Sequence, residues 1–167
     1  MGIPYRFDPL GTLGAGNELP FVQPVMTSAT TWSNEPSFGC AVTGYTTWNP
    51  AWFSMDGDAE TYTIFGNGLN AYDASHGIVI ALEKPLLLKK ITVLCTIETT
   101  NEVYLFGGDA DNEELLYFGS AGPREKHEFV IALSRNTRYS RYRLFFAHAT
   151  TPWTWVYELN LDATYMP

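Results

Sequence analysis

One short stretch concentrates side chains that could do chemistry: AWFSMDGDAETYT, residues 51–63. It places Asp56, Asp58 and Glu60 close together, with Thr61 directly after them. Carboxylates at this spacing suit a solvated turn, a catalytic acid–base pair or an oxygen-rich cation site. An acid–base pair needs a cleft and two different environments to separate its pKa values. An acidic turn near sheet edges offers neither, so the solvated turn and the cation site remain.

The other residues with catalytic potential are the histidines His76, His127 and His148. No two of them form a His-x-x-x-His pair, none stands beside a nucleophile motif, and no Gly-x-Ser-x-Gly elbow occurs. Cys40 and Cys95 make neither a zinc pair nor a disulfide framework, and we expect both to be buried. The sequence therefore predicts a protein that is not an enzyme.

The composition is that of an acidic globular chain. Of its 167 residues, 46% are hydrophobic and 17% are charged, which suits one domain with its own core. Lys and Arg total 10 against 18 Asp and Glu, a formal charge of −8 that repels phosphates. We therefore expect neither nucleic acid nor an anionic membrane surface as a partner. No apolar run suits membrane insertion, and the opening residues do not resemble a secretory signal peptide.

Short β-strands must position these residues. Aromatic residues reach 15%, and runs of β-branched and aromatic residues alternate with turn signals from residue 25 onward. The expected strands lie within residues 39–45, 61–65, 77–82, 89–97, 103–108, 115–120, 128–133, 142–147 and 155–161. This pattern predicts an all-β antiparallel sandwich or barrel. The acidic segment 109–114 is expected to be a solvated hairpin tip.

Five motifs, in order, resemble those of the discoidin family, which comprises the C-type domains of coagulation factors and related galactose-binding-like carbohydrate modules. AWFSMDGDAETYT resembles the family signature AW-x-A-F-D-G-N/D-x-x-T-x-W. Further motifs are MTSATTW, GIVIALEKPLLLKKITV, LFGGDADNEEL, and YSRYRLFF followed by VYELNL. The resemblance spans residues 26–161 and implies an eight-stranded jelly-roll sandwich. Gly77 is a departure, because the family often has Trp there.

The resemblance also implies one structural calcium ion at the acidic turn. The expected ligands are the side chains of Asp56, Asp58, Thr61 and Glu158 and the carbonyl oxygens of Phe53 and Tyr157. Calcium takes mixed carboxylate and carbonyl oxygens from flexible loops, and Gly57 permits a tight turn between the two aspartates. Such an ion would join the first half of the fold to its last strand. The alternative is a solvated turn without an ion.

Aromatic residues in the expected loops are candidates for ligand binding: Tyr45, Trp48, Tyr72, Trp153 and Trp155. Trp48 matches a loop that contacts ligands in discoidin-like relatives. Aromatic rings stack on the apolar face of a sugar while neighbouring polar groups bind its hydroxyls. The alternative is that these rings close the ends of the sandwich or contact a partner protein.

The expected domains are an extended N-terminal arm (1–24), a discoidin-like sandwich (25–163) and a C-terminal tail (164–167). The arm is rich in Pro and Gly, which excludes a helix, yet it also carries apolar residues. An extended apolar segment of this kind fits into a groove on a partner protein, where it would act as an anchor, or into a groove on its own domain.

The MTS opening at residue 26 resembles phage versions of the family. We therefore expect a non-catalytic structural, decoration or fibre-associated protein of a bacteriophage virion, which contacts other virion proteins through its arm and displays an adhesion domain for host surface glycans. The alternative is a stand-alone, calcium-stabilised carbohydrate-binding module that is extracellular without a classical signal peptide. Assembly into a homo-oligomer stays open.

Overall fold

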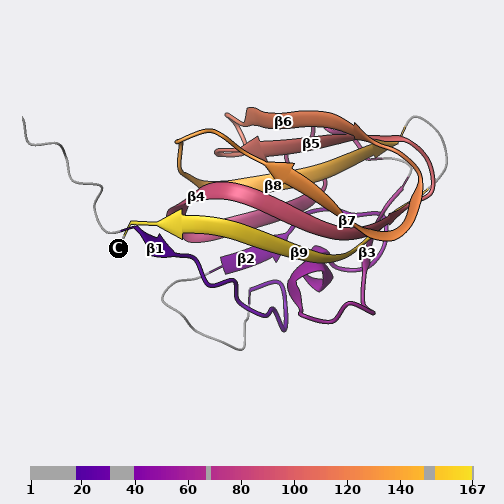
Figure 1. Cartoon of the computed structure of the whole chain (residues 1–167), viewed down its shortest axis with the longest axis horizontal. Helices are drawn as coiled ribbons and strands as arrows, with labels where there is room; N and C mark the ends of the chain where they lie inside the picture. The colour runs from indigo at the N-terminus through magenta and orange to yellow at the C-terminus, as the bar shows by residue number, and fades with distance from the viewer. Residues whose placement is uncertain (1–17, 31–39, 67–68, 149–152, 167) are drawn as a thin grey trace, which may run out of the picture.

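The computed structural model describes residues 18–30, 40–66, 69–148 and 153–166. These residues form nine strands and one short 3-10 helix, η1 (Ala51–Met55) (Figure 1). The strands are β1 (Leu19–Pro20), β2 (Cys40–Thr43), β3 (Thr63–Phe65), β4 (Ile78–Ile97), β5 (Asn101–Gly107), β6 (Glu114–Ala121), β7 (Arg124–Ala132), β8 (Tyr139–His148) and β9 (Thr154–Tyr165). Within the described ranges, no helix is long and apolar enough to cross a membrane.

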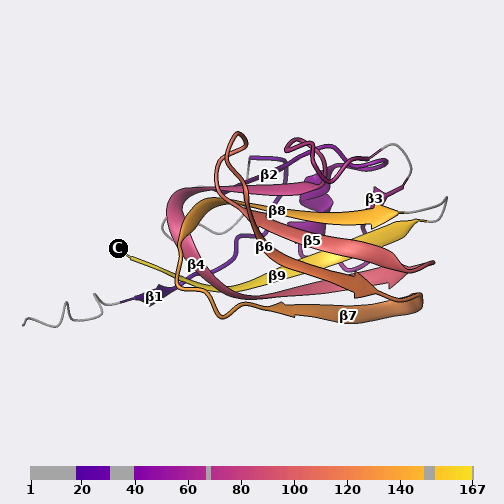
Figure 2. The same cartoon turned by 90° about the horizontal axis from the view of Figure 1, so that it is seen from above.

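The strands form two packed layers (Figure 2). One layer has the order β2–β4–β8–β5–β6, and in the other β9 lies between β4 and the short strands β1 and β3, with β7 on the far side of β4. All these pairings are antiparallel. The predicted antiparallel jelly-roll sandwich is therefore confirmed.

Strand β4 belongs to both layers, and this differs from the two separate strands expected at 77–82 and 89–97. Its first part pairs with β2 and β8, and its second part pairs with β7 and β9. Pairing with β8 shifts register between Ala81 and Leu86, where the chain bends from one layer to the other. Pro85 lies in this bend, where the missing N–H breaks no ladder bond.

The core lies between the layers and follows from strand alternation. On β4, Ile91, Val93, Cys95 and Ile97 point inward at every second position and are buried. Cys95 and the likewise buried Cys40 are free thiols, as expected from the sequence. Burial raises the pKa of each thiol to about 12, so both stay protonated and behave as small apolar side chains.

The sandwich extends beyond the boundaries expected from the sequence. Strand β1 pairs with the end of β9, with Leu19 opposite Tyr165 and Pro20 opposite Thr164. The Phe21 N–H also donates to the Ala163 carbonyl at 2.8 Å. Residues 19–20 of the expected arm and residues 164–165 of the expected tail thus lie in the sheet. The first part of the expected arm, residues 1–17, lies outside the described residues.

Gly77, at the start of β4, explains one departure from the discoidin pattern. Its φ is +101°, and a Cβ atom there would lie 2.5 Å from the Leu144 carbonyl oxygen. The backbone of β8 therefore occupies the space that a side chain would need. A tryptophan at this position is incompatible with this approach of the two strands.

Candidate functional site

The acidic turn that follows η1 brings three of the expected calcium ligands together. One carboxylate oxygen of Asp56, Oδ1, accepts the Asp58 N–H at 2.9 Å. The other, Oδ2, accepts the Thr61 hydroxyl at 2.7 Å. Gly57 sits between the two aspartates with φ +75°, as the expected tight turn requires.

Glu158 approaches this turn from β9. In the ladder with β4, Tyr157 is an extra residue opposite the step from Leu94 to Cys95, a β-bulge of the kind that re-aims neighbouring side chains. Burial raises the pKa of Glu158 to about 7, and the charge of Asp56 adds to this effect. The Oε2 atom of Glu158 is buried with no hydrogen-bond partner among the described residues. The Gly57 backbone N–H donates to this carboxylate, so only the Oε2 atom lacks a donor. A buried carboxylate oxygen without a donor is costly, and a cation would relieve that cost.

The donor chemistry of this cluster fits calcium, although its side chains are not arranged as a metal site. Over the described residues, no three His, Cys, Asp or Glu side chains are gathered closely enough to hold a metal ion. The carboxylate of Asp56 is instead closed by hydrogen bonds from its own turn. The unpaired Glu158 oxygen is stronger evidence for a cation than the arrangement of the aspartates is against one. Small movements of the exposed turn could bring the aspartates to an ion, but they would leave the Glu158 oxygen buried without a donor. Tyr157, at the bulge, directly precedes Glu158, and Phe53, in η1, lies one helical turn before Asp56. Their carbonyl contacts with an ion stay predictions.

Two of the five aromatic candidates, Trp48 and Trp153, lie together. The rings of Trp48 and Trp153 stack with centroids 4.9 Å apart and planes 7° apart. Trp48 is 59% exposed and is fixed at the edge of β3, where the Ile64 N–H donates to its carbonyl at 2.9 Å. Glu98 fixes Trp153 by accepting its backbone N–H at 3.3 Å. Trp153 covers one face of Trp48, and the exposed remainder of Trp48 forms an aromatic platform.

The other three aromatic candidates lie elsewhere. The ring of Tyr45 packs against His76, with centroids 5.2 Å apart. Tyr72 is 86% exposed in the loop before β4. Trp155 is half-buried on β9, opposite Thr96 of β4. The structure therefore divides the five candidates among several places.

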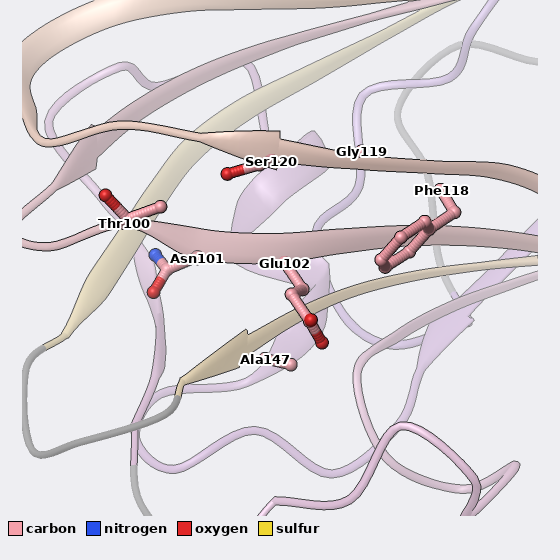
Figure 3. A pocket seen from close by; sticks show the side chains of 7 residues that line it. All are labelled: Thr100, Asn101, Glu102, Phe118, Gly119, Ser120 and Ala147. Carbon is pink, nitrogen blue, oxygen red and sulfur yellow. The ribbon is translucent and has the colours of Figure 1, made fainter.

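A hollow of about 650 Å³ opens on the outer face of β5 and β6 (Figure 3). Phe118 and Glu102 project into it from these neighbouring strands, and Ala147 of β8 borders it. The sequence analysis did not single out any of these residues. The alternation of side chains along two consecutive strands could have predicted which residues share the outer face. Which of them lie opposite one another depends on the register of the hairpin, and the sequence analysis did not predict that register.

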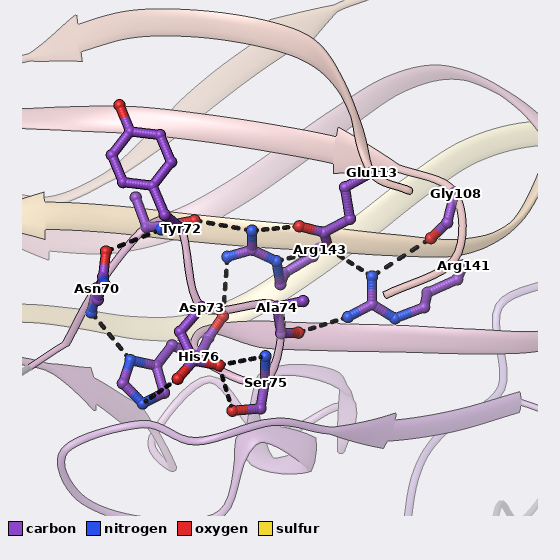
Figure 4. A network of polar contacts seen from close by, with 11 residues as sticks. Asn70, Tyr72, Asp73, Ala74, Ser75, His76, Gly108, Glu113, Arg141 and Arg143 are labelled. Carbon is purple, nitrogen blue, oxygen red and sulfur yellow. Dashed lines mark hydrogen bonds and ion pairs between the residues drawn. The ribbon is translucent and has the colours of Figure 1, made fainter. Parts of the chain in front are cut away.

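A buried ion network was also missed (Figure 4). Arg143, on β8, is 1% exposed, and its Nε and Nη2 atoms donate to the two carboxylate oxygens of Glu113 at 2.7 and 2.5 Å. Arg143 also donates to the carbonyl oxygens of His76 and Ala71. Arg141 donates to the same Glu113 carboxylate and to the Ala74 carbonyl. The network fastens the loop before β4 to the turn before β6.

Glu113 corrects the expectation for segment 109–114. Residues 109–112 are exposed, as a hairpin tip should be, but the Glu113 side chain is only 10% exposed. The physical reason lies in β8, where Arg141 and Arg143 are two residues apart and so share one face of the strand. Two buried or half-buried arginines on one face of a strand require an acidic partner. The two-residue spacing of Arg141 and Arg143 is therefore the feature of the sequence that could have predicted a buried acid.

Glu113 makes stability depend on pH. Burial raises its pKa, but the hydrogen bonds from Arg143 and Arg141 outweigh burial and hold the pKa of Glu113 below its ordinary value. A carboxyl group with a lowered folded-state pKa stabilises the protein above its unfolded pKa, and this stabilisation is lost as the pH falls through the folded value. We expect the urea midpoint to fall as the pH drops through and below about 4.5, the ordinary pKa of this carboxyl group. Glu113→Gln, which cannot titrate, should show a smaller fall, and an equal fall would contradict this origin.

Comparisons with known proteins identify the fold. No protein-family model and no curated protein matches this chain. Among solved structures, the family 32 carbohydrate-binding module of NanJ from Clostridium perfringens, in complex with galactose, matches with a TM-score of 0.55 and 12% identity, over 74% of this chain and 92% of that chain. The family 32 module of AlyQ, in complex with 4,5-unsaturated mannuronic acid, matches with a TM-score of 0.56 and 14% identity, over 76% of this chain and 95% of that chain.

A family 89 glycoside hydrolase from Clostridium perfringens, in complex with GlcNAc-α-1,4-galactose, matches with a TM-score of 0.60 and 20% identity. That match covers 76% of this chain but only 14% of the enzyme chain. The similarity is therefore to a small part of that enzyme, whereas the two family 32 modules match over nearly their whole length. The chain has the galactose-binding-like sandwich fold of family 32 carbohydrate-binding modules.

Proposed function

We propose that this chain is a non-catalytic carbohydrate-binding module and that Trp48 is its sugar platform. The exposed Trp48 ring, stacked on Trp153, is the observation that carries the proposal. A rigid ring with a solvent-facing surface suits the apolar face of a pyranose. The fold supports this assignment, because similar structures include modules in complex with galactose and with 4,5-unsaturated mannuronic acid.

The proposal includes one structural calcium ion at the acidic turn. Its side-chain ligands would be Asp56, Asp58, Thr61 and Glu158, with carbonyl oxygens from Phe53 and Tyr157. Calcium bound there would supply positive charge to a cluster of carboxylates. Glu158 would tie the turn to β9, and Gly57 would keep the turn tight. The unpaired Oε2 atom of Glu158 supports this part of the proposal.

The Trp48→Ala variant is expected to lose at least about tenfold in affinity for any glycan that the wild-type protein binds on a glycan array, because it loses the stacking surface. Its melting temperature should change little, since Trp48 is largely exposed. Tyr45→Ala is the matched control, because Tyr45 is equally exposed but packs against His76. Retained binding by Trp48→Ala, or silence of the wild-type protein across the array, would contradict the proposal.

The role in a bacteriophage virion stays a prediction from the sequence, as do the virion location and the contacts of the arm with other virion proteins. Residues 1–17 lie outside the described residues, so only residues 18–24 of the expected arm are described. The comparisons favour the alternative, a carbohydrate-binding module, because the similar structures are carbohydrate-binding modules. Its extracellular location stays a prediction from the sequence.

A further inference from the structure

We propose a second carbohydrate site on the outer face of β5 and β6, which takes a pyranose unit of a neutral glycan. This site shares no residue with the Trp48 platform. It is the hollow of about 650 Å³ described above, a size within the range of small-molecule sites.

The register of the β5–β6 hairpin creates an aromatic wall. Tyr104 lies opposite Phe118, and Glu102 lies opposite Ser120 one step further along. Because side chains alternate along a strand, all four share the outer face. The rings of Tyr104 and Phe118 are in contact, with centroids 5.0 Å apart, and Phe118 is 56% exposed. Phe118 thus has a supported ring with a surface free for stacking.

A polar edge borders this aromatic wall. The Tyr104 hydroxyl donates to Oε2 of Glu102 at 2.6 Å, and this bond raises the pKa of Tyr104 to about 12. The bond orients the Glu102 carboxylate beside the Phe118 ring (Figure 3). A carboxylate accepts hydrogen bonds from adjacent hydroxyl groups, and the Ser120 hydroxyl both donates and accepts. A ring surface beside such groups matches a pyranose, which has apolar C–H faces and a hydroxylated rim.

The space for the ligand comes from a small side chain. Ala147 lies opposite Glu102 on β8 and leaves room above the sheet. Below it, the Asn101 side chain donates to the Thr154 hydroxyl at 2.5 Å and so ties the floor of the hollow to β9. The hollow therefore has a fixed floor and one aromatic wall.

Charge selects among possible ligands. The chain carries a formal charge of −8, and Glu102 places a carboxylate at the hollow itself. Uronic acids, sulfated sugars and nucleotides would be repelled, whereas a neutral pyranose would not. The two sites are also neighbours, because Glu98, which holds Trp153, and Thr100, which lines the hollow, belong to the turn between β4 and β5. A glycan chain that reaches both sites would bind more tightly than its single units.

Affinity electrophoresis in gels that contain soluble neutral galactan, glucan or mannan tests this site. Phe118→Ala should weaken retardation by at least about tenfold in apparent affinity, and Glu102→Gln should weaken it less. Leu115→Ala is the matched control, because it removes another exposed apolar side chain from β6 outside the hollow. Trp48→Ala should keep part of the retardation. In ¹⁵N-labelled wild-type protein, the amide signals of Glu102, Phe118 and Ser120 should shift with the retained oligosaccharide.

The outcomes separate the two sites. Loss in Phe118→Ala with the expected shifts at β5 and β6 supports the second site, even if Trp48→Ala binds normally. Loss only in Trp48→Ala, with Phe118→Ala unchanged, overturns the second site and leaves the Trp48 platform intact. Absence of retardation by all three polysaccharides overturns it too. If choline, but no sugar, shifts the amide signals of Glu102, Phe118 and Ser120, the aromatic wall is a cation site, and the proposal is overturned.

Discussion

Replacing Glu113 with alanine is expected to lower the free energy of unfolding by about 3–5 kcal/mol. Arg143 is 1% exposed and would keep only the carbonyl oxygens of His76 and Ala71 as hydrogen-bond partners. An unpaired buried guanidinium is costly because it loses the carboxylate that neutralises its charge away from water. Arg141 is half-buried and would also lose its carboxylate. Urea denaturation followed by tryptophan fluorescence measures the effect.

Two control variants assign the loss to the uncompensated charge. In Glu113→Leu/Arg143→Met, the fully buried arginine and its acid both become apolar, and part of the lost stability should return. The return is incomplete because Arg141 still lacks its carboxylate and keeps only carbonyl partners, such as that of Ala74. Asp162→Ala removes one partner of the exposed Lys90–Asp162 pair, whose atoms are 4.0 Å apart, and should cost less than about 1 kcal/mol. A loss below about 1 kcal/mol for Glu113→Ala would show that the network contributes little to stability.

Calcium is expected to raise the melting temperature of the wild-type protein by about 5–11 °C when its concentration is about one hundred times the dissociation constant. An ion that binds only the folded state stabilises that state by mass action, and the stabilisation disappears with a chelator. Scanning calorimetry with calcium and then with a chelator measures the shift. A melting temperature indifferent to both would sink the calcium proposal.

Substitutions within the same turn separate ligands from bystanders. Glu158→Gln should abolish the calcium response and raise the melting temperature of the calcium-free protein. Burial and the charge of Asp56 disfavour ionised Glu158, and a neutral amide avoids that cost. Glu60→Gln should keep the full response, because the Glu60 side chain is 88% exposed and pairs with Lys126. A lowered melting temperature in calcium-free Glu158→Gln would contradict this account of the buried carboxylate.

Strand alternation and turn residues predicted the sandwich, because burial on one face imposes a period of two on any sequence. The same reasoning expected two strands where β4 is continuous. The proline and the neighbouring polar residues predicted a loop between two strands. In the structure the strand continues through Pro85, because the pairing with β8 shifts register there. The resemblance to discoidin domains pointed to the acidic turn as an ion site, and the bulge at Tyr157 adds a feature that no spacing rule encodes.

The two aromatic surfaces, at Trp48 and at Phe118, depend on the register of strand pairing, which could not be predicted from the sequence. Trp48 and Trp153 are far apart in the chain and stack only because Trp48 bridges Ile64 of β3, which pairs with β9. The wall at Phe118 likewise requires the exact alignment of β5 with β6. A shift of one residue would turn those rings to the other face. The high aromatic content predicts a binding surface, but the pairing of the strands decides which aromatic side chains come into contact.

The position of β9 has a consequence for synthesis on the ribosome. β9 follows every other strand in the chain, yet it lies between β4 on one side and β1 and β3 on the other. Until it emerges, the nascent chain presents the open edges of β3 and β4, which are templates for pairing with other chains. The emerging polypeptide must therefore avoid intermolecular association before its last strand arrives, and it completes its layer by inserting that strand into the centre.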